Sequence, residues 1–257
     1  MNSTSHNGYF ELRAELLGNS RNRSLTGPEL VRAGRLVYGR PAGLSLYGVP
    51  APRMAGLGLR LLGRTTIECS VDAHVQSVAD VLAFADFGVP VRGAGFVADL
   101  FCGSGNFGHH LGRRLRKPVY ASELDPLVHA ATRHNFDVLG ITVDLRPVDY
   151  RDLLGRLPVS GEGDVYIVEP PWGPAFTADG LDLTRTAPPV PEILDDIRRS
   201  RLGMPCVVAI KTNDQIAGDS LARSFRGAHH LASVSPNPIL PTGANMDFHL
   251  YLLGCPG

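Results

Sequence analysis

The chain has 257 residues, of which 44% are hydrophobic, 19% charged and 7% aromatic, the composition of a folded protein with a substantial core. Its formal net charge is zero, so the chain as a whole has no electrostatic attraction to nucleic acid or to a membrane surface. No apolar run reaches the ~20 residues of a membrane-spanning helix, and residues 1–10 lack the features of a signal peptide. We therefore expect a cytoplasmic protein without a membrane span.

Charge and cysteine are unevenly distributed. Residues 1–64 contain nine Arg and three Glu, a local net charge of +6, which could bind phosphates or form a solvated face. The cysteines at 69, 102, 206 and 255 have no metal-ligand spacing, and the two His pairs are adjacent in sequence, so their rings cannot face one ion. We expect structural thiols, a reducing compartment and no metal. Scarce Lys beside abundant Arg, Ala and Gly is typical of a GC-rich bacterial genome.

The N-terminal part, residues 1–69, is rich in Gly, Arg and Pro. Apolar spacing predicts two short helices in it, at 11–18 and 28–39. We interpret this part as an Arg-rich helical extension or lid. The pattern becomes more regular after it, where Ser70 or Asp72 is expected to cap a helix that runs to Phe87.

Strands and helices then alternate to the end of the chain. The predicted strands are 96–101, 118–122, 142–148, 164–168, 206–210, 230–234 and 247–253, the last two antiparallel, and the predicted helices are 106–115, 126–139, 192–201 and 215–225. This alternation predicts an α/β fold, a Rossmann-like doubly wound seven-stranded sheet over residues 70–257. Ligands of such sheets bind at the carboxyl ends of the strands, where the motifs below all lie.

A Gly-rich turn, CGSGNFG at 102–108, follows the first strand of the sheet. Small residues let the backbone turn sharply and approach a ligand, and the free N–H groups of the following helix attract an anion. Asp99, at the strand end, could accept hydrogen bonds from the turn or from a ligand ammonium. The glycines also fit G-x-G-x-x-G, so the turn alone does not distinguish one nucleotide cofactor from another.

Two more acidic residues follow the next two strands. Glu123 lies 18 residues beyond Gly105, a position from which a carboxylate binds two ribose hydroxyls. Asp125 fits the role of a helix cap better than Glu123 does. Asp149, with the backbone of Tyr150, could bind the edge of an adenine, or it could only cap the next helix.

The fourth strand ends in Glu169-Pro170-Pro171-Trp172-Gly173. The prolines fix the backbone and remove N–H donors, so carbonyl groups here are left to accept hydrogen bonds. A flat ring with an amine could stack on Trp172 while Glu169 and the Pro170 carbonyl bind its protons, and Glu169 could act as a general base if burial raises its pKa. The alternative is a rigid loop with a half-buried Trp.

These features together carry a family resemblance. The segment DLFCGSGN at 99–106, the acid after the second strand and the P-P-W motif resemble the class I S-adenosylmethionine-dependent methyltransferases over residues 70–253. Within that class, VEPPWGPAF is similar to the S-P-P-W-G-G-P segment of the trimethylguanosine synthases, and ECSVDAHVQSVADVLA and IKTNDQI resemble two further segments of theirs. Glu169 replaces the Ser of that family, Pro174 its second Gly, and Lys211-Thr212 its Pro-Arg.

The resemblance implies an enzyme that uses S-adenosylmethionine to methylate a nitrogen of a planar, nucleobase-like or heteroaromatic acceptor. The cofactor contacts that it implies are Asp99, Gly103, Gly105, Glu123 and Asp149. From their positions next to these residues or at the strand ends, we also expect cofactor contacts from Phe101, Asn106, Leu124, Tyr150 and Glu169. Glu169, Pro170 and Trp172 would be catalytic, and Trp172, Phe176 and Asn213 would contact the acceptor.

The sequence leaves other functions open. The acceptor could be an RNA base or a small molecule, as in a methyltransferase that tailors a natural product, and the cofactor could serve another reaction such as cyclisation. An RNA uracil C5-methyltransferase would need a Cys nucleophile after the fifth strand, where this chain has Ile210-Lys211-Thr212-Asn213. A non-catalytic subunit would normally have lost one of the motifs. The sequence does not indicate an oligomeric state.

Overall fold

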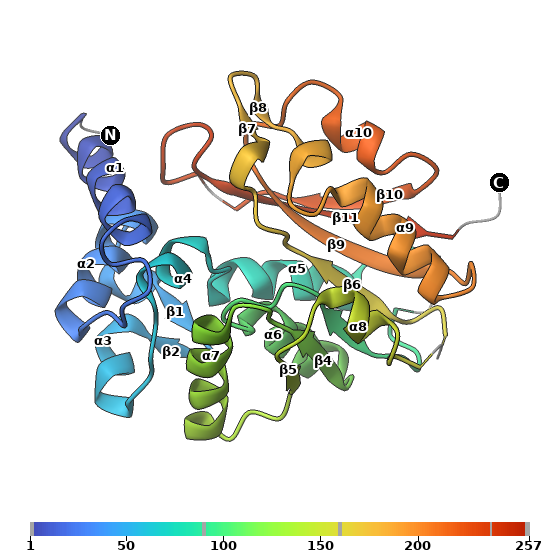
Figure 1. Ribbon diagram of the computed structural model, residues 1–257, viewed down its shortest axis with the longest axis horizontal. Coiled ribbons are helices and arrows are strands. Elements are labelled where there is room, and N and C mark those ends of the chain that lie inside the picture. The colour runs from blue at the N-terminus through green and yellow to red at the C-terminus, as the bar shows by residue number, and fades with distance from the viewer. Residues whose placement is uncertain (1–2, 89–90, 159–160, 237, 255–257) are drawn as a thin grey trace.

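The structure is a computed structural model that describes residues 3–88, 91–158, 161–236 and 238–254 (Figure 1). Seven strands form one sheet in the order β10-β11-β9-β6-β3-β4-β5. Their bounds are β3 Val97–Asp99, β4 Val119–Ser122, β5 Asp144–Arg146, β6 Val165–Val168, β9 Cys206–Asn213, β10 His229–Val234 and β11 Met246–Leu253. All pairs are parallel except those of β11, which runs antiparallel to both β9 and β10. The predicted doubly wound seven-stranded sheet is therefore confirmed.

Helices cover both faces because side chains alternate along each buried strand. Val97, Val165 and Val207 lie in one apolar cluster with side chains of α5 (Asp72–Phe84), α6 (Asn106–Leu115) and α7 (Pro126–Leu139). The neighbouring residues Ala98 and Tyr166 lie in the other, with α8 (Tyr150–Leu154) and α9 (Val190–Ser200). None of the helices in the described ranges is long and apolar enough to cross a bilayer.

The N-terminal part contains α1 (Ser3–Leu17), α2 (Gly27–Tyr38), the strand pair β1 (Ser45–Leu46) and β2 (Val49–Pro50), α3 (Ala51–Met54) and α4 (Gly63–Glu68). These elements gather at one end of the molecule beside α5 and α7 (Figure 1). Leu12 and Leu30 belong to the same apolar cluster as Phe107 and Phe248 of the sheet domain, so the N-terminal part packs directly on one face of the sheet layer. The domain boundary at residue 69 stays a prediction.

Helices α6 and α7 have the predicted bounds, but other predicted boundaries are wrong. Strand β9 continues to Asn213 because β11 pairs with it along its whole length. The predicted helix 215–225 is only α10 (Ser220–Ser224), since Gln215 and Ala217 bond instead to Leu181 in the small hairpin of β7 (Phe176–Thr177) and β8 (Gly180–Leu181). Neither predicted side chain caps α5, which begins with Val71 at the N-cap position.

Candidate active site

The Gly-rich turn joins β3 to α6 and has the geometry that its sequence predicts. Gly103 and Gly105 have φ of +51° and +70°, in the left-handed region that favours glycine. A Cβ on Gly105 would lie 2.4 Å from the Phe136 ring, whereas a Cβ on Gly103 would meet nothing within 4 Å. The backbone at Gly103 therefore borders open space, as a turn that cradles a ligand requires.

Asp99 lies beneath this turn at the end of β3. Its carboxyl group is 2% exposed and accepts a hydrogen bond from the Gly108 N–H (3.1 Å). Burial, followed by the negative charge of Glu169, raises the pKa of Asp99 well above its usual value. A bound cation beside Asp99 would therefore favour its ionised form.

Glu123 follows β4 and supports the turn from the other side. Its Oε2 accepts from the Gly103 N–H (3.0 Å) and its Oε1 from the Asp125 N–H (2.8 Å), which leaves lone pairs on both oxygens. Burial raises the pKa of Glu123. Asp125 caps α7 by accepting from Leu127 and Val128, as predicted, and the Leu124 side chain is 66% exposed beside Glu123.

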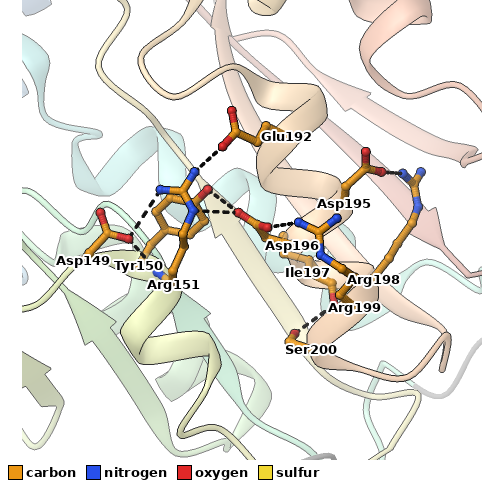
Figure 2. Close-up of polar contacts among 10 residues, drawn as sticks. All are labelled: Asp149, Tyr150, Arg151, Glu192, Asp195, Asp196, Ile197, Arg198, Arg199 and Ser200. Atoms are coloured by element: carbon orange, nitrogen blue, oxygen red, sulfur yellow. Dashed lines mark hydrogen bonds and ion pairs between the residues drawn. The ribbon is translucent and has the colours of Figure 1, made fainter.

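Asp149 begins α8, where its carboxylate accepts from the Arg151 N–H (2.9 Å). It thus fills the capping role that the sequence left open. Figure 2 shows Arg151 between Asp149 and two acids of α9, with the Tyr150 hydroxyl donating to Asp196 (2.6 Å). The rings of Tyr150 and Phe101 lie 5.0 Å apart, so these predicted cofactor residues lie close to one another.

The motif after β6 has its carboxylate between two donors. Glu169 accepts from the Ser70 hydroxyl (2.8 Å) and from Lys211 Nζ (3.3 Å) of β9, and its side chain is 16% exposed. Lys211 also donates to the Glu68 carbonyl (2.5 Å), and its Nζ is 5.9 Å from the centre of the Trp172 ring. These contacts orient Glu169 beside Trp172.

The residues after Glu169 present an aromatic pair. The Trp172 and Phe176 rings meet edge to face at 5.5 Å, and Phe176 is 45% exposed. Among the described residues nothing donates to the Pro170 carbonyl, while the Pro171 carbonyl accepts from Ala187. The role of these groups in binding an acceptor stays a prediction.

Two residues predicted to contact ligands, Asn106 and Asn213, use their side chains in hydrogen bonds within the protein. The Asn106 side chain accepts from the Tyr47 N–H (2.7 Å) and donates to the Ser70 carbonyl (2.8 Å). Asn213 is buried within β9, where its amide donates to Gly243 (2.9 Å) and shapes the loop before β11. Their predicted contacts with cofactor and acceptor stay predictions.

Sequence reasoning missed four residues at this site: Tyr47, Arg64, Ser70 and Lys211. Tyr47 has a left-handed φ of +58° and reaches the turn through its N–H and through a hydroxyl bond to the Ser104 carbonyl. Lys211 carried a signal, because one of only two lysines in the chain follows a run of apolar strand residues. Ser70 lies in the segment ECSVDAHVQSVADVLA that carries the family resemblance, but only a capping role was predicted for it. Tyr47 and Arg64 carried no signal, since their partners are distant in sequence.

Three of the four cysteines lie within the described residues. Cys69, Cys102 and Cys206 are buried and form no disulfide, and burial raises the pKa of all three, to about 11 for Cys69 and about 12 for Cys206. Cys255 lies outside the described residues. In the part of the chain that the structure describes, no three His, Cys, Asp or Glu side chains are grouped so as to hold a metal ion.

A scan of the sequence against protein-family models finds no match, and neither does a search of the curated proteins. The fold of this chain resembles those of several solved structures. TrmN from Thermus thermophilus is 19% identical over 80% of this chain and 54% of that chain, with a TM-score of 0.49. An S-adenosylmethionine-dependent methyltransferase from Clostridium acetobutylicum is 12% identical over 72% of this chain and 93% of that chain, with a TM-score of 0.44. Magnesium protoporphyrin IX methyltransferase from Synechocystis is 15% identical over 70% of this chain and 77% of that chain, with a TM-score of 0.44. These likenesses concern the fold alone and carry no information on what this chain binds.

Proposed function

We propose that this chain is an S-adenosylmethionine-dependent methyltransferase that acts on a nitrogen of a planar acceptor. The observation that carries the proposal is the meeting of Gly103, Glu123 and Glu169 at the carboxyl ends of adjacent parallel strands. Ligands bind at this edge in doubly wound sheets. The proposal places cofactor and acceptor side by side there.

The residues present fit the cofactor. The open side of Gly103 admits a ligand against the backbone, and the unused lone pairs of Glu123 suit two ribose hydroxyls. The buried Asp99 suits a ligand ammonium, and exposed Leu124 offers an apolar surface to an adenine. S-adenosylmethionine, when bound, supplies an electrophilic methyl group on a sulfonium centre.

The acceptor side of the site favours positioning over covalent catalysis. Trp172 and Phe176 offer aromatic surface to a planar ring, while Glu169 and the Pro170 carbonyl can accept protons of its amine. Holding the nitrogen lone pair in line with the methyl group lowers the barrier to direct transfer, in which the acceptor nitrogen is itself the nucleophile and no nucleophilic side chain is needed. A uracil C5-methyltransferase is disfavoured, because Cys206 is buried at the start of β9, away from the carboxyl ends, with its pKa raised to about 12.

The test combines binding and turnover. We expect the purified chain to bind S-adenosylhomocysteine in calorimetry and to transfer labelled methyl from S-adenosylmethionine to a member of a panel of nucleosides, heteroaromatic amines and small RNAs. Glu169→Gln and Trp172→Ala should lower the transfer rate about 10²-fold, while S-adenosylhomocysteine affinity changes less than about threefold. Loss of that affinity in both variants would contradict the assignment of Glu169 and Trp172 to the acceptor.

Matched controls are exposed residues of the same type. Glu162→Gln and Phe84→Ala should leave both the rate and the affinity unchanged, since Glu162 and Phe84 are exposed and lie outside the proposed site. Salt then separates the two acceptor classes. Methylation of an RNA should fall steeply between 50 and 200 mM salt, roughly tenfold or more, whereas methylation of a small neutral acceptor should not.

A further inference from the structure

Arg64, in the first turn of α4, is a charged residue of the N-terminal part that lies at the cofactor side of the site. Its side chain is 11% exposed, and one terminal nitrogen contacts Asp125 Oδ1 at 2.6 Å. Its Nε is buried and has no hydrogen-bond partner among the described residues. An unsatisfied buried donor costs about 1–3 kcal/mol, so the ion pair with Asp125 holds this guanidinium in place at a cost to stability. The terminal nitrogen that does not contact Asp125 is the part of the fork left to donate to a ligand.

The partner of Arg64 links it to Glu123. Asp125 donates its N–H to Glu123 Oε1 and accepts from Arg64 through its own carboxylate. The positive charge of Arg64 also opposes the rise that burial causes in the pKa of Glu123. The guanidinium and the Glu123 carboxylate are therefore close neighbours. The guanidinium offers only hydrogen-bond donors, and the carboxylate only acceptors.

A vicinal diol fits between two such groups. Each hydroxyl of a diol donates one proton and accepts at its lone pairs. The Glu123 oxygens can take the two protons, but a carboxylate cannot supply the donors that the hydroxyl oxygens need. An arginine presents several N–H groups in a fixed fork, and only one contact to Arg64 is accounted for by the described residues.

We propose that Arg64 donates to the ribose hydroxyls of the cofactor and completes, from the N-terminal part, the diol site that Glu123 begins. This inference rests on the proposed function. Through Arg64, the N-terminal part would then contribute to cofactor affinity.

The experiment is calorimetric titration with S-adenosylhomocysteine and with its 2′-deoxy and 3′-deoxy analogues. We expect Arg64→Met to weaken binding of S-adenosylhomocysteine by about tenfold or more, as loss of a charge-assisted hydrogen bond does. The same substitution should weaken binding of the analogue that lacks the contacted hydroxyl by much less. An equal loss for all three ligands would overturn the inference, because Arg64 would then act through another group.

Two control variants separate direct contact from anchoring. Arg60→Met removes the same charge from an exposed side chain of the same segment, whose backbone stays bonded to Asn135, and should leave affinity unchanged. Asp125→Ser keeps a capping hydroxyl on α7 but loses the ion pair with Arg64. If Asp125→Ser lowers affinity as much as Arg64→Met does, Arg64 is only an anchor and the inference is wrong.

A second substitution guards against misfolding. Arg64→Lys keeps a cation near Asp125 but loses the fork of N–H donors, and should weaken S-adenosylhomocysteine binding several-fold without lowering the melting temperature. If the wild type, Arg64→Lys and Arg64→Met all bind S-adenosylhomocysteine with the same affinity, this inference is wrong while the proposed function still stands. A wild-type chain that binds no S-adenosylhomocysteine overturns the proposed function and this inference together.

Discussion

At the scale of the residue, Asp99 is a buried carboxyl group whose ionised form destabilises the fold. Its carboxyl group is buried near Glu123 and Glu169, and burial raises its pKa. A raised carboxyl pKa means that the folded state holds the proton more tightly than the unfolded state does. Folding stability therefore falls as the pH rises above about 4, the ordinary pKa of the group, and continues to fall until the folded-state pKa is passed. A bound cation would offset this loss.

Asp99→Asn should separate stability from binding. At pH 8 we expect the unfolding free energy of the ligand-free chain to rise by about 1 kcal/mol or more, because an amide carries no charge to bury and still accepts from Gly108. Affinity for S-adenosylhomocysteine should fall at least about tenfold, since the ammonium loses its counter-charge. Urea denaturation and calorimetry measure the two effects.

The control for Asp99→Asn is Asp80→Asn. Asp80 is 57% exposed and forms a surface pair with Arg114, which is worth at most about 1 kcal/mol. Its substitution should leave affinity unchanged. A ligand-free Asp99→Asn protein less stable than the wild type would show that the ionised carboxylate stabilises the turn.

At the scale of the element, the start of α6 holds the N-terminal part against the sheet. Asn106 is 1% exposed and bonds on one side to the Tyr47 N–H and on the other to the Ser70 carbonyl. Asp72 adds a second connection, since it accepts from Ser45 (2.5 Å) and from the Gly48 N–H (2.9 Å). The first residues of two helices, α6 and α5, thus hold residues 45–48 against the Gly-rich turn and the sheet domain.

Asn106→Ala should weaken this connection strongly. It leaves a buried N–H and a buried carbonyl without partners, so we expect a loss of about 2–4 kcal/mol in unfolding free energy by urea denaturation. Hydrogen exchange at residues 44–48 should become faster. Asn22→Ala, at an exposed position of the N-terminal part, serves as the control, and equal small losses in both variants would contradict the importance of the Asn106 bonds.

At the scale of the whole molecule, two half-buried histidines lie where the N-terminal part meets the sheet domain. Burial, then the charge of Lys211, lowers the pKa of His74 to about 4, and burial, then His110, lowers that of His109 to about 4. The His74 ring packs edge to face on Tyr38, and the His109 ring on Tyr47. Both histidines are therefore neutral in the folded state at physiological pH.

This arrangement predicts acid sensitivity in a defined window. Below about 6.5 the unfolded chain takes up protons that the folded chain refuses until about pH 4, so stability should fall as the pH drops through this range. A shift of this size is worth roughly 3 kcal/mol for a fully buried group, and solvent screening lowers the contribution of each of these half-buried histidines below that. In a His74→Phe, His109→Phe double variant, the unfolding free energy from urea denaturation should depend much less on pH between 6.5 and 4. If its slope with pH equals that of the wild type, the two histidines are not the source of the acid sensitivity.

Local chemistry made several features predictable from sequence. The bounds of α6 and α7 follow from a Gly-rich start in one case and from Asp125-Pro126 and Gly140 in the other. The left-handed glycines and the cap at Asp125 follow from backbone sterics and from hydrogen bonds over two or three residues. The helix expected at 215–225 failed because pairing with the distant Leu181 outweighed helical spacing.

The sequence by itself determined the order of strands and helices and the acids at the strand ends, because both depend on neighbours a few residues away. Only the tertiary structure decided that Ser70 and Lys211 hold Glu169, that Tyr47 contacts the turn and that Arg64 lies beside Asp125. The two partners of Glu169 are 99 and 42 positions away from it and come from the segment before α5 and from β9. Tyr47 and Arg64 lie 59 and 61 positions from their partners and depend on how the N-terminal part packs on the sheet domain. No local pattern encodes such pairs, since each exists only after the layers have assembled.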